Sequence, residues 1–312
     1  MNKNQQIAVI GGGLMGHGIA LTFARAGHYV AVHDPAQETL QSLPQRVSDS
    51  LRLLGTSDND IARMLKRIEL CDGIKAAVSD AAVIFEAAPE KLELKQAIFA
   101  EVEAHAPRDA ILASNTSVIQ ITKIMEHLKL RQRALGTHWW NPPHMIPLVE
   151  VIKTEWTDPE VADKMIDLLE DAGKTPALVE KDVPGFIGNR LQHALWREAI
   201  SLVEKGICSA KAVDDVVKAS FGRRLAVLGP LENADLVGLE LTQDIHRQVL
   251  FDLDARPDPS PLLQELLDED RTGMASGHGF RKWTQGDLER TKTRVALHLS
   301  ALEGMFQNAA ES

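Results

Sequence analysis

The chain has 312 residues, of which 44% are hydrophobic and 25% charged, values that fit a globular domain and exclude intrinsic disorder. Its 34 basic and 44 acidic side chains give a net charge of -10, which disfavours nucleic acid and anionic membrane surfaces as partners. With two cysteines, no apparent signal peptide and no apolar run of membrane-spanning length, we expect a cytoplasmic protein without a disulfide scaffold.

Short apolar runs alternate with longer helical stretches in the first half of the chain. Ile7–Ile10 is a β-branched strand that ends in glycines, and Leu14–Ala26 follows with helical spacing. Further strands are predicted at Tyr29–His33, Ala82–Ala87, Ala110–Ala113, Ala134–Thr137, Val149–Ile152 and Ala177–Val179. Strands joined by crossover helices predict an α/β fold with a doubly wound, mainly parallel sheet over residues 1–183, a Rossmann domain.

The pattern changes twice along the chain. Residues 37–69 are too long for a simple connection and have the polar and apolar spacing of two helices, which we interpret as a helical insertion. After Pro184-Gly185 only helical periods remain, over Ile187–Glu204, Ala210–Ser220, Leu239–Leu253 and Leu288–Phe306. We therefore predict an all-helical second domain over residues 184–312.

A glycine-rich turn follows the first strand. The segment Gly11–Gly16 contains G-x-G-x-x-G, and Asp34 ends the next strand eighteen residues later. In this context Gly11 permits the tight turn, Gly13 lets a pyrophosphate approach the backbone, and Gly16 lets the helix pack on the strand. The Asp34 carboxylate suits ribose hydroxyls and would repel a 2′-phosphate, so NAD is favoured over NADP as the cofactor.

A histidine and a carboxylate lie at a predicted sheet edge. His138 ends a strand just before Pro142 and Pro143, and Glu150 lies twelve residues later in the next strand. Histidine suits general acid/base work near neutral pH, and a neighbouring carboxylate can hold its tautomer. On spacing alone a structural histidine is an equal alternative. The chain shows no convincing set of metal ligands.

Taken in order, four motifs resemble those of the L-3-hydroxyacyl-CoA dehydrogenase family. They are Gly11–Gly16 with Asp34; Ser114-Asn115-Thr116-Ser117; His138-Trp139-Trp140-Asn141-Pro142 with Leu148-Val149-Glu150; and Pro184-Gly185-Phe186-Ile187-Gly188-Asn189-Arg190. The resemblance covers nearly the whole chain. It implies NAD-dependent oxidation of an L-3-hydroxyl group, a homodimer formed through the helical domain, and a role in fatty acid metabolism.

The resemblance also implies roles for individual residues. His138 would be the general acid/base and Glu150 its partner, while Ser117 and Asn189 would hydrogen-bond the reacting oxygen of the substrate. The expected cofactor-binding residues are Gly11, Gly13, Leu14, Met15, Gly16, Asp34, Glu90, Lys95, Asn115 and Asn141. Ser117 as a helix cap and Asn189 as a solvated helix residue are the structural alternatives.

The chain departs from the acyl-CoA pattern in ways that bear on the substrate. Family members that act on CoA esters tend to have a lysine-rich helical insertion, whereas residues 37–69 contain only scattered basic side chains. The segment around Arg223, Arg224 and Gly229-Pro230 is more similar to the λ-crystallin/L-gulonate 3-dehydrogenase branch. Either arginine could hold a substrate carboxylate, as in L-gulonate or carnitine, or could be an ordinary surface charge.

Two other classes of function remain alternatives. Related β-hydroxyacid dehydrogenases use a lysine on the interdomain helix, where this chain has Asn189, so that mechanism is disfavoured. A non-catalytic, crystallin-like protein would not need His138 and Glu150 together with Ser117. The prediction is therefore an NAD-dependent dehydrogenase of an L-3-hydroxy acid or an L-3-hydroxyacyl-CoA.

Overall fold

The computed structural model describes residues 5–310 of the chain. These residues divide into two units. The first contains the chain up to Arg190 together with the segment that begins at Leu299, and the second contains Leu191–His298. Mixed sheet and helix structure is confined to the first unit, and the second is helical, as the sequence predicts.

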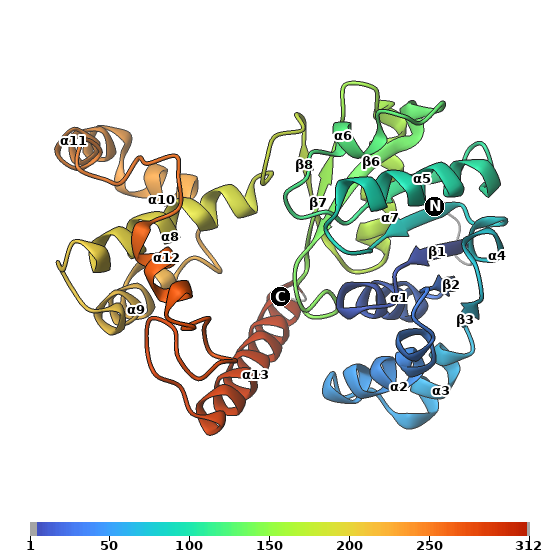
Figure 1. The fold of residues 1–312 in the computed structure, drawn as a ribbon, viewed down its shortest axis with the longest axis horizontal. Helices are drawn as coiled ribbons and strands as arrows, with labels where there is room; N and C mark the ends of the chain where they lie inside the picture. The colour runs from blue at the N-terminus through green and yellow to red at the C-terminus, as the bar shows by residue number, and fades with distance from the viewer. Residues whose placement is uncertain (1–4, 311–312) are drawn as a thin grey trace. The chain divides into compact units, whose positions relative to one another are not determined.

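Within residues 5–310, the first unit is built on one eight-stranded sheet with the order β3-β2-β1-β4-β5-β6-β7-β8 (Figure 1). The strands are β1 (Gln6–Ile10), β2 (Tyr29–His33), β3 (Ile68–Cys71), β4 (Val83–Glu86), β5 (Ile111–Ser114), β6 (Ala134–Trp139), β7 (Leu148–Ile152) and β8 (Thr175–Val179). All neighbouring strands are parallel except β6 and β7, which are antiparallel. The first six strands have the Rossmann order, which confirms the predicted fold class.

Helices cover both faces of this sheet. They are α1 (Leu14–Ala26), α2 (Gln37–Leu53), α3 (Asp58–Leu65), α4 (Ile74–Val78), α5 (Leu92–His105), α6 (Ile121–Met125) and α7 (Pro159–Asp171), with a short 3₁₀ helix at Arg131–Arg133. Side chains of α1, α2 and α7 share one buried core, and those of α4, α5 and α6 share another. Alternate residues of β1 supply the two cores: Ile7 and Val9 the first, Ala8 and Ile10 the second.

Strand β3 was not predicted. It pairs with β2 and forms the edge of the sheet, directly after the helical insertion that the sequence does indicate as α2 and α3. Glu69 and Leu70 in its centre are both exposed, so the strand lacks the alternation that marks a half-buried strand. The insertion therefore ends earlier than residue 69, at the start of β3.

The second unit is helical. Helix α8 (Gly188–Glu204) begins in the first unit, and it is followed by α9 (Ala210–Ala219), a 3₁₀ helix at Phe221–Arg223, α10 (Pro230–Val237), α11 (Leu239–Val249), α12 (Pro261–Asp268) and α13 (Gln285–Ala310). Helices α10 and α12 were not predicted. Each has eight residues and begins at a proline, so in sequence each looks like a proline-containing loop.

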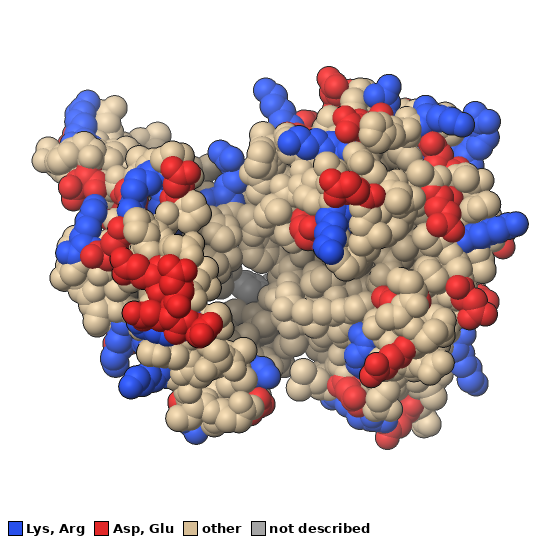
Figure 2. Space-filling view, viewed as in Figure 1, with Lys and Arg blue, Asp and Glu red and all other residues tan. Residues whose placement is uncertain are grey.

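Charged side chains of both signs are interspersed on the face shown in Figure 2, and acidic ones gather around α12. This agrees with the net charge of -10. Over residues 5–310, no helix combines the length and the apolar composition that crossing a membrane requires.

A substitution at Gly16 tests the packing of α1 against the glycine-rich turn. A Cβ atom at Gly16 would lie 1.7 Å from the carbonyl oxygen of Gly11, whereas one at Gly13 would have no heavy atom within 4 Å. We expect Gly16→Ala to lower the free energy of unfolding by about 2 kcal/mol or more, because α1 must move away from the turn. Gly13→Ala is the matched control, with a change below about 0.5 kcal/mol. Urea unfolding measures both, and equal stabilities would contradict this packing.

Candidate active site

His138 and Glu150 form a buried pair across two antiparallel strands. They are directly opposite in the β6–β7 register, and His138 Nδ1 lies 2.7 Å from Glu150 Oε2. Their side chains are 5% and 1% exposed. An ionised carboxylate can only accept hydrogen bonds, so Nδ1 donates, and Nε2 is left as the ring nitrogen that can take up a proton. The pairing that the sequence predicted is thus present in the structure.

The other oxygen of Glu150 binds the backbone at the start of α8. Its Oε1 accepts hydrogen bonds from the N–H groups of Ile187 at 2.8 Å and Gly188 at 3.0 Å. Burial alone would raise the pKa of Glu150, but the hydrogen bonds from His138, Gly188 and Ile187 outweigh it and lower that pKa below its ordinary value. The carboxylate therefore stays ionised at neutral pH.

Two aromatic rings fix the orientation of the His138 imidazole. The centroids of the Trp140 and Phe186 rings lie 5.3 Å and 5.5 Å from it. Phe186 is fully buried and has a positive φ of 51°, a backbone conformation that is costly for a residue with a side chain. Gly188 allows close approach, because a Cβ atom there would lie 2.4 Å from the Trp140 ring.

Ser117 and Asn189 lie together beside this pair. Asn189 Nδ2 donates to the carbonyl oxygen of Ser117 at 2.9 Å, and Asn189 directly follows Gly188, which binds Glu150. Asn115 is fixed to the same region, since its Oδ1 accepts from the Trp139 N–H at 3.0 Å. The segment after β5, the paired strands β6 and β7 and the start of α8 thus bring the four predicted catalytic residues together.

The N-terminus of α1 suits a pyrophosphate. Gly11 has a φ of 104°, and no side chain caps the helix or places an acidic group in its first turn. The space above Gly13 is open, so the backbone N–H groups of Leu14, Met15 and Gly16 can donate hydrogen bonds to an anion. These residues fit the phosphates of a dinucleotide.

Asp34 is oriented for a ribose by two backbone bonds. Its Oδ2 accepts from the Gly12 N–H at 2.8 Å and its Oδ1 from the Ala36 N–H at 2.8 Å. The carboxylate is therefore fixed next to the glycine-rich turn, as NAD binding requires.

Glu90 and Lys95 belong to a hydrogen-bonded network at the end of β4. Lys95 is fully buried, and its Nζ binds Glu86 Oε1 at 2.7 Å and the carbonyl oxygen of Ala88 at 3.1 Å. Glu90 accepts from the N–H groups of Ser117 and Val118, at 3.0 Å and 3.1 Å. The Lys95 ammonium group is therefore held by groups of the protein itself, and its expected role at the cofactor stays a prediction.

One arginine at the cofactor site was missed by the sequence analysis. Arg46 extends from α2 and donates to the carbonyl oxygens of Gly12 at 2.7 Å, Gly13 at 3.2 Å and Thr39 at 2.7 Å. These bonds hold the backbone of the glycine-rich turn in place. No local sequence pattern marks Arg46, because Gly13 and Gly12, whose carbonyl oxygens it contacts, lie 33 and 34 positions earlier in the chain.

The remaining predicted site residues are not joined to the His138–Glu150 pair by any of these bonds. Asn141 is exposed just after β6, and Arg223 and Arg224 are exposed in the second unit. Their roles therefore stay predictions. Among residues 5–310, no cluster of three or more His, Cys, Asp or Glu side chains could hold a metal ion.

A glycine-rich turn ahead of α1, a carboxylate fixed beside it after β2 and a buried histidine–carboxylate pair at the sheet edge define an NAD-dependent oxidoreductase. Residues 6–183 match the NAD binding domain of 3-hydroxyacyl-CoA dehydrogenase, and residues 185–283 match its C-terminal domain. The chain therefore belongs to the 3-hydroxyacyl-CoA dehydrogenase family.

Similar proteins carry different substrates in their names. The 5-formyl-3-hydroxy-2-methylpyridine 4-carboxylate 5-dehydrogenase of Mesorhizobium japonicum is 33% identical, over 97% of this chain and 98% of its own. Human mitochondrial hydroxyacyl-coenzyme A dehydrogenase is 34% identical, over 89% of this chain and 91% of its own. The human lambda-crystallin homolog is 34% identical over 74% of each chain.

Two similar solved structures are also named for different substrates. A 5-formyl-3-hydroxy-2-methylpyridine 4-carboxylic acid 5-dehydrogenase, described as an NAD⁺-dependent dismutase, superposes with a TM-score of 0.89 and 33% identity, over 97% of this chain and 99% of its own. The (S)-3-hydroxybutyryl-CoA dehydrogenase of Ralstonia eutropha gives a TM-score of 0.76 and 29% identity, over 91% and 100%. This chain is thus similar to enzymes named for a free carboxylate and to enzymes named for a CoA ester.

Glu150→Gln tests the pair without changing its shape. The amide oxygen can still accept from Ile187 and Gly188, but the amide NH₂ then faces His138 Nδ1 and favours the tautomer with the proton on Nε2. We expect kcat to fall by about 10²-fold or more, because the base is lost. Stopped-flow or steady-state NADH formation measures this. The control is Glu180→Gln, which removes an exposed carboxylate bound to Lys153 and should leave kcat unchanged. A kcat within threefold of the original protein for Glu150→Gln would contradict the assignment.

Proposed function

We propose that the chain oxidises the L-3-hydroxyl group of a small substrate with a free carboxylate, and reduces the 3-oxo form in reverse. His138 acts as general acid/base and Glu150 holds its tautomer. The buried hydrogen bond of 2.7 Å between them is the observation that carries the acid/base assignment. The site suits proton removal from an alcohol, because one imidazole nitrogen is fixed and the other is left to react.

The protein's part in the reaction is to move one proton and stabilise one developing charge. NAD⁺, when bound, supplies the hydride acceptor. His138 Nε2 takes the hydroxyl proton, and the Glu150 carboxylate stabilises the imidazolium that forms. Ser117 and Asn189, which are bonded to each other, provide dipoles near the oxygen on which negative charge develops, each typically worth about 3 kcal/mol of barrier in a dry site.

The helical insertion supports a substrate without CoA. It contains five basic side chains, and four of them are engaged by groups of the protein itself. Arg46 binds backbone carbonyls, Arg52 pairs with Asp49 and Asp58, Arg63 pairs with Asp60, and Arg67 donates to the carbonyl oxygen of Ala24. Arg46 and Arg67 are therefore committed to backbone carbonyls, and carboxylates already neutralise Arg52 and Arg63 in the absence of a phosphate. This engagement is the observation that carries the substrate proposal.

The comparisons support this choice and also a second candidate. A relative named for a pyridine carboxylate matches this chain over nearly its full length, with a TM-score of 0.89 for the corresponding structure. The second candidate is an L-3-hydroxyacyl-CoA of fatty acid metabolism, which both family domains and the human relative favour. In either case the same His138–Glu150 pair would serve.

We also infer a cytoplasmic homodimer formed through the second unit. Among the described residues 191–298 only Ser201, Leu266 and Gly279 are buried. A groove of about 230 Å³ between α8 and α9 is lined almost entirely by apolar side chains, among them Leu195, Val216 and Phe221. A helical domain with so little core of its own needs a partner to bury its apolar face. A second copy of the chain has the same face and can bury it across a two-fold axis. Both cysteines are outside disulfides, which suits a reducing compartment.

An NAD⁺ reduction screen tests the substrate. It compares L-3-hydroxybutyryl-CoA with L-3-hydroxybutyrate, L-gulonate, carnitine and 5-formyl-3-hydroxy-2-methylpyridine 4-carboxylate, by absorbance of NADH. We expect kcat/KM for at least one free L-3-hydroxy acid to exceed that for the CoA ester by about tenfold or more, since four of the five basic side chains of the insertion already contact other groups of the protein. A preference for the CoA ester would establish the second candidate instead.

The same screen on Arg224→Ala tests the predicted carboxylate anchor. Loss of a charge-assisted bond should raise KM for the preferred free acid by about tenfold or more, with little effect on its methyl ester. The control is Arg247→Ala, which removes another exposed arginine of the second unit. Unchanged kinetics for both Arg224→Ala and Arg223→Ala would leave the anchor without support.

The double variant Leu195→Glu/Val216→Glu tests the dimer. Both side chains are exposed, by 41% and 61%, so charges there need not disturb folding. We expect the original protein to have twice the chain mass of 34.3 kDa by light scattering, and the variant to have the mass of one chain, because charges disfavour burial of this face. Leu53→Glu, on an exposed site of α2, is the control and should remain dimeric. A dimeric double variant would exclude this surface as the interface.

A further inference from the structure

The loop between β6 and β7, residues 140–147, connects the two strands that carry His138 and Glu150. We call it the β6–β7 loop. It carries Asn141, and its two prolines, Pro142 and Pro143, have no N–H groups to donate. Its own backbone bonds form a single turn, in which the carbonyl oxygen of Pro142 accepts from Met145 and Ile146 at 3.0 Å each. Other parts of the protein must therefore hold the rest of the loop in place.

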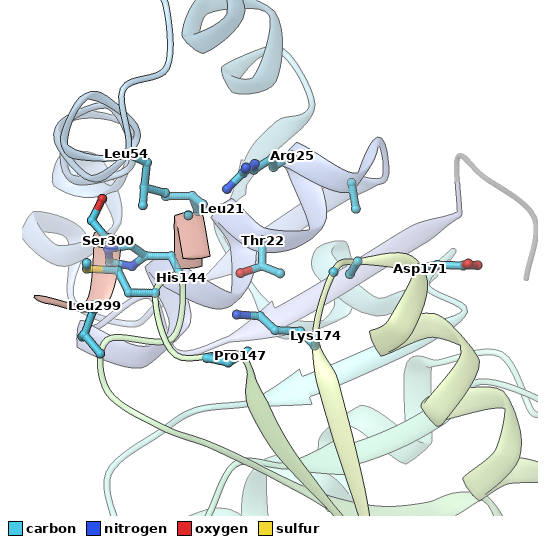
Figure 3. A pocket seen from close by; sticks show the side chains of 15 residues that line it. Leu21, Thr22, Arg25, Leu54, His144, Pro147, Asp171, Lys174, Leu299 and Ser300 are labelled. Atoms are coloured by element: carbon cyan, nitrogen blue, oxygen red, sulfur yellow. The ribbon is translucent and has the colours of Figure 1, made fainter. Parts of the chain in front are cut away.

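Lys174 provides the hold on one side. It follows α7 after Gly173, whose φ of 76° turns the chain. Its Nζ donates to the carbonyl oxygens of Pro143 at 2.6 Å and Ile146 at 3.0 Å, and lies 5.3 Å from the centroid of the Trp139 ring. Figure 3 shows Lys174 pointing toward the chain between His144 and Pro147. One ammonium group thus bonds two carbonyl oxygens of the loop and contacts the residue next to His138.

Helix α1 also packs against the loop. A Cβ atom at Gly18 would lie 2.4 Å from Pro143 Cγ, so the helix backbone touches the loop there. The His144 ring packs edge-on against His17 of the same helix, with centroids 5.8 Å apart. Because α1 also presents its N-terminus to the cofactor phosphates, the loop that carries Asn141 is fixed to the element that binds the dinucleotide.

We propose that Lys174 is a positioning residue for the nicotinamide half of the cofactor site. It holds the β6–β7 loop against α1 and so sets the place of Asn141. This rests on the cofactor-binding role predicted above for Asn141, a position that the family resemblance places near the nicotinamide half of NAD. Lys174 and His144 also line a pocket of about 520 Å³ beside α1, which contains none of the predicted site residues. Without the ammonium group, two carbonyls lose their charged donor and the loop has space to move.

Lys174→Met tests this proposal, because it keeps most of the side-chain volume and removes the charge. We measure the dissociation constants of NADH and of ADP-ribose, which lacks the nicotinamide, together with kcat and the thermal midpoint. NADH binding should weaken by about tenfold, while ADP-ribose binding stays within twofold, because only the nicotinamide end is disturbed. Lys153→Met, which removes a lysine paired with Glu180 in the same unit, is the control and should change neither constant.

Gly18→Ala is a second variant that acts on the contact between α1 and the loop. Its Cβ atom would force Pro143 away from α1, and we expect the same selective loss of NADH affinity. This variant keeps the proposal testable if Lys174→Met does not fold. Equal weakening of NADH and ADP-ribose in both variants, or no weakening in either, would overturn the proposal, since a purely structural role affects both ligands alike.

Asn141→Ala separates this proposal from the proposed function. If Asn141→Ala lowers NADH affinity selectively and Lys174→Met does not, Lys174 has no positioning role while the proposed site stands. If neither variant changes the ratio of NADH to ADP-ribose affinity, the place assigned to Asn141 is wrong and the role of Lys174 is overturned with it. The Glu150→Gln result is independent of both.

Discussion

A carboxylate that is buried between two strands remains ionised only where hydrogen bonds replace the water it has lost. Glu150 meets this condition with three bonds, one from His138 and two from backbone N–H groups that lead into α8. Its charge therefore fixes the imidazole tautomer and at the same time places the start of α8. Since Asn189 lies at that start and binds Ser117, the geometry of the proposed catalytic residues depends on this one carboxylate.

The cofactor end of the site is built mainly from backbone. Phosphates would meet N–H groups of α1, and the turn before that helix is fixed from two sides. Asp34 accepts from the Gly12 N–H, and Arg46 donates to the carbonyl oxygens of Gly12 and Gly13. Gly12 is thus bound at both its N–H and its C=O, which leaves the turn little freedom and pre-organises it for its ligand. The helical insertion that supplies Arg46 thus supports the glycine-rich turn in this chain.

The sequence predicted those parts of the site that are local. The glycine-rich turn, Asp34 and the strand that ends at His138 each have a pattern within a few residues, and the fold class follows from the alternation of strands and helices. Edge strand β3 was missed because its central residues, Glu69 and Leu70, are both exposed. Arg46 and Lys174 were missed for a different reason: each binds backbone carbonyls about 30 residues away, and such contacts leave no spacing to recognise. Lys95 has a family motif, but its complete burial follows only from the packing of α5 on the sheet.

These contacts also indicate where substrate preference can vary within the family. The His138–Glu150 pair, the buried Lys95–Glu86 pair and the glycine-rich turn are each bonded to several strands or helices, so a substitution there leaves buried groups without partners and costs stability as well as activity. Exposed arginines such as Arg223 and Arg224, and surface charges of α2 and α3, carry no such penalty. A scaffold of this kind can keep hydride chemistry constant while the groups that recognise a CoA nucleotide or a free carboxylate are exchanged. Such a division between constrained and freely varying residues would produce relatives about one-third identical to this chain that act on different substrates. Two such relatives are named for a pyridine carboxylate and for a hydroxyacyl-CoA.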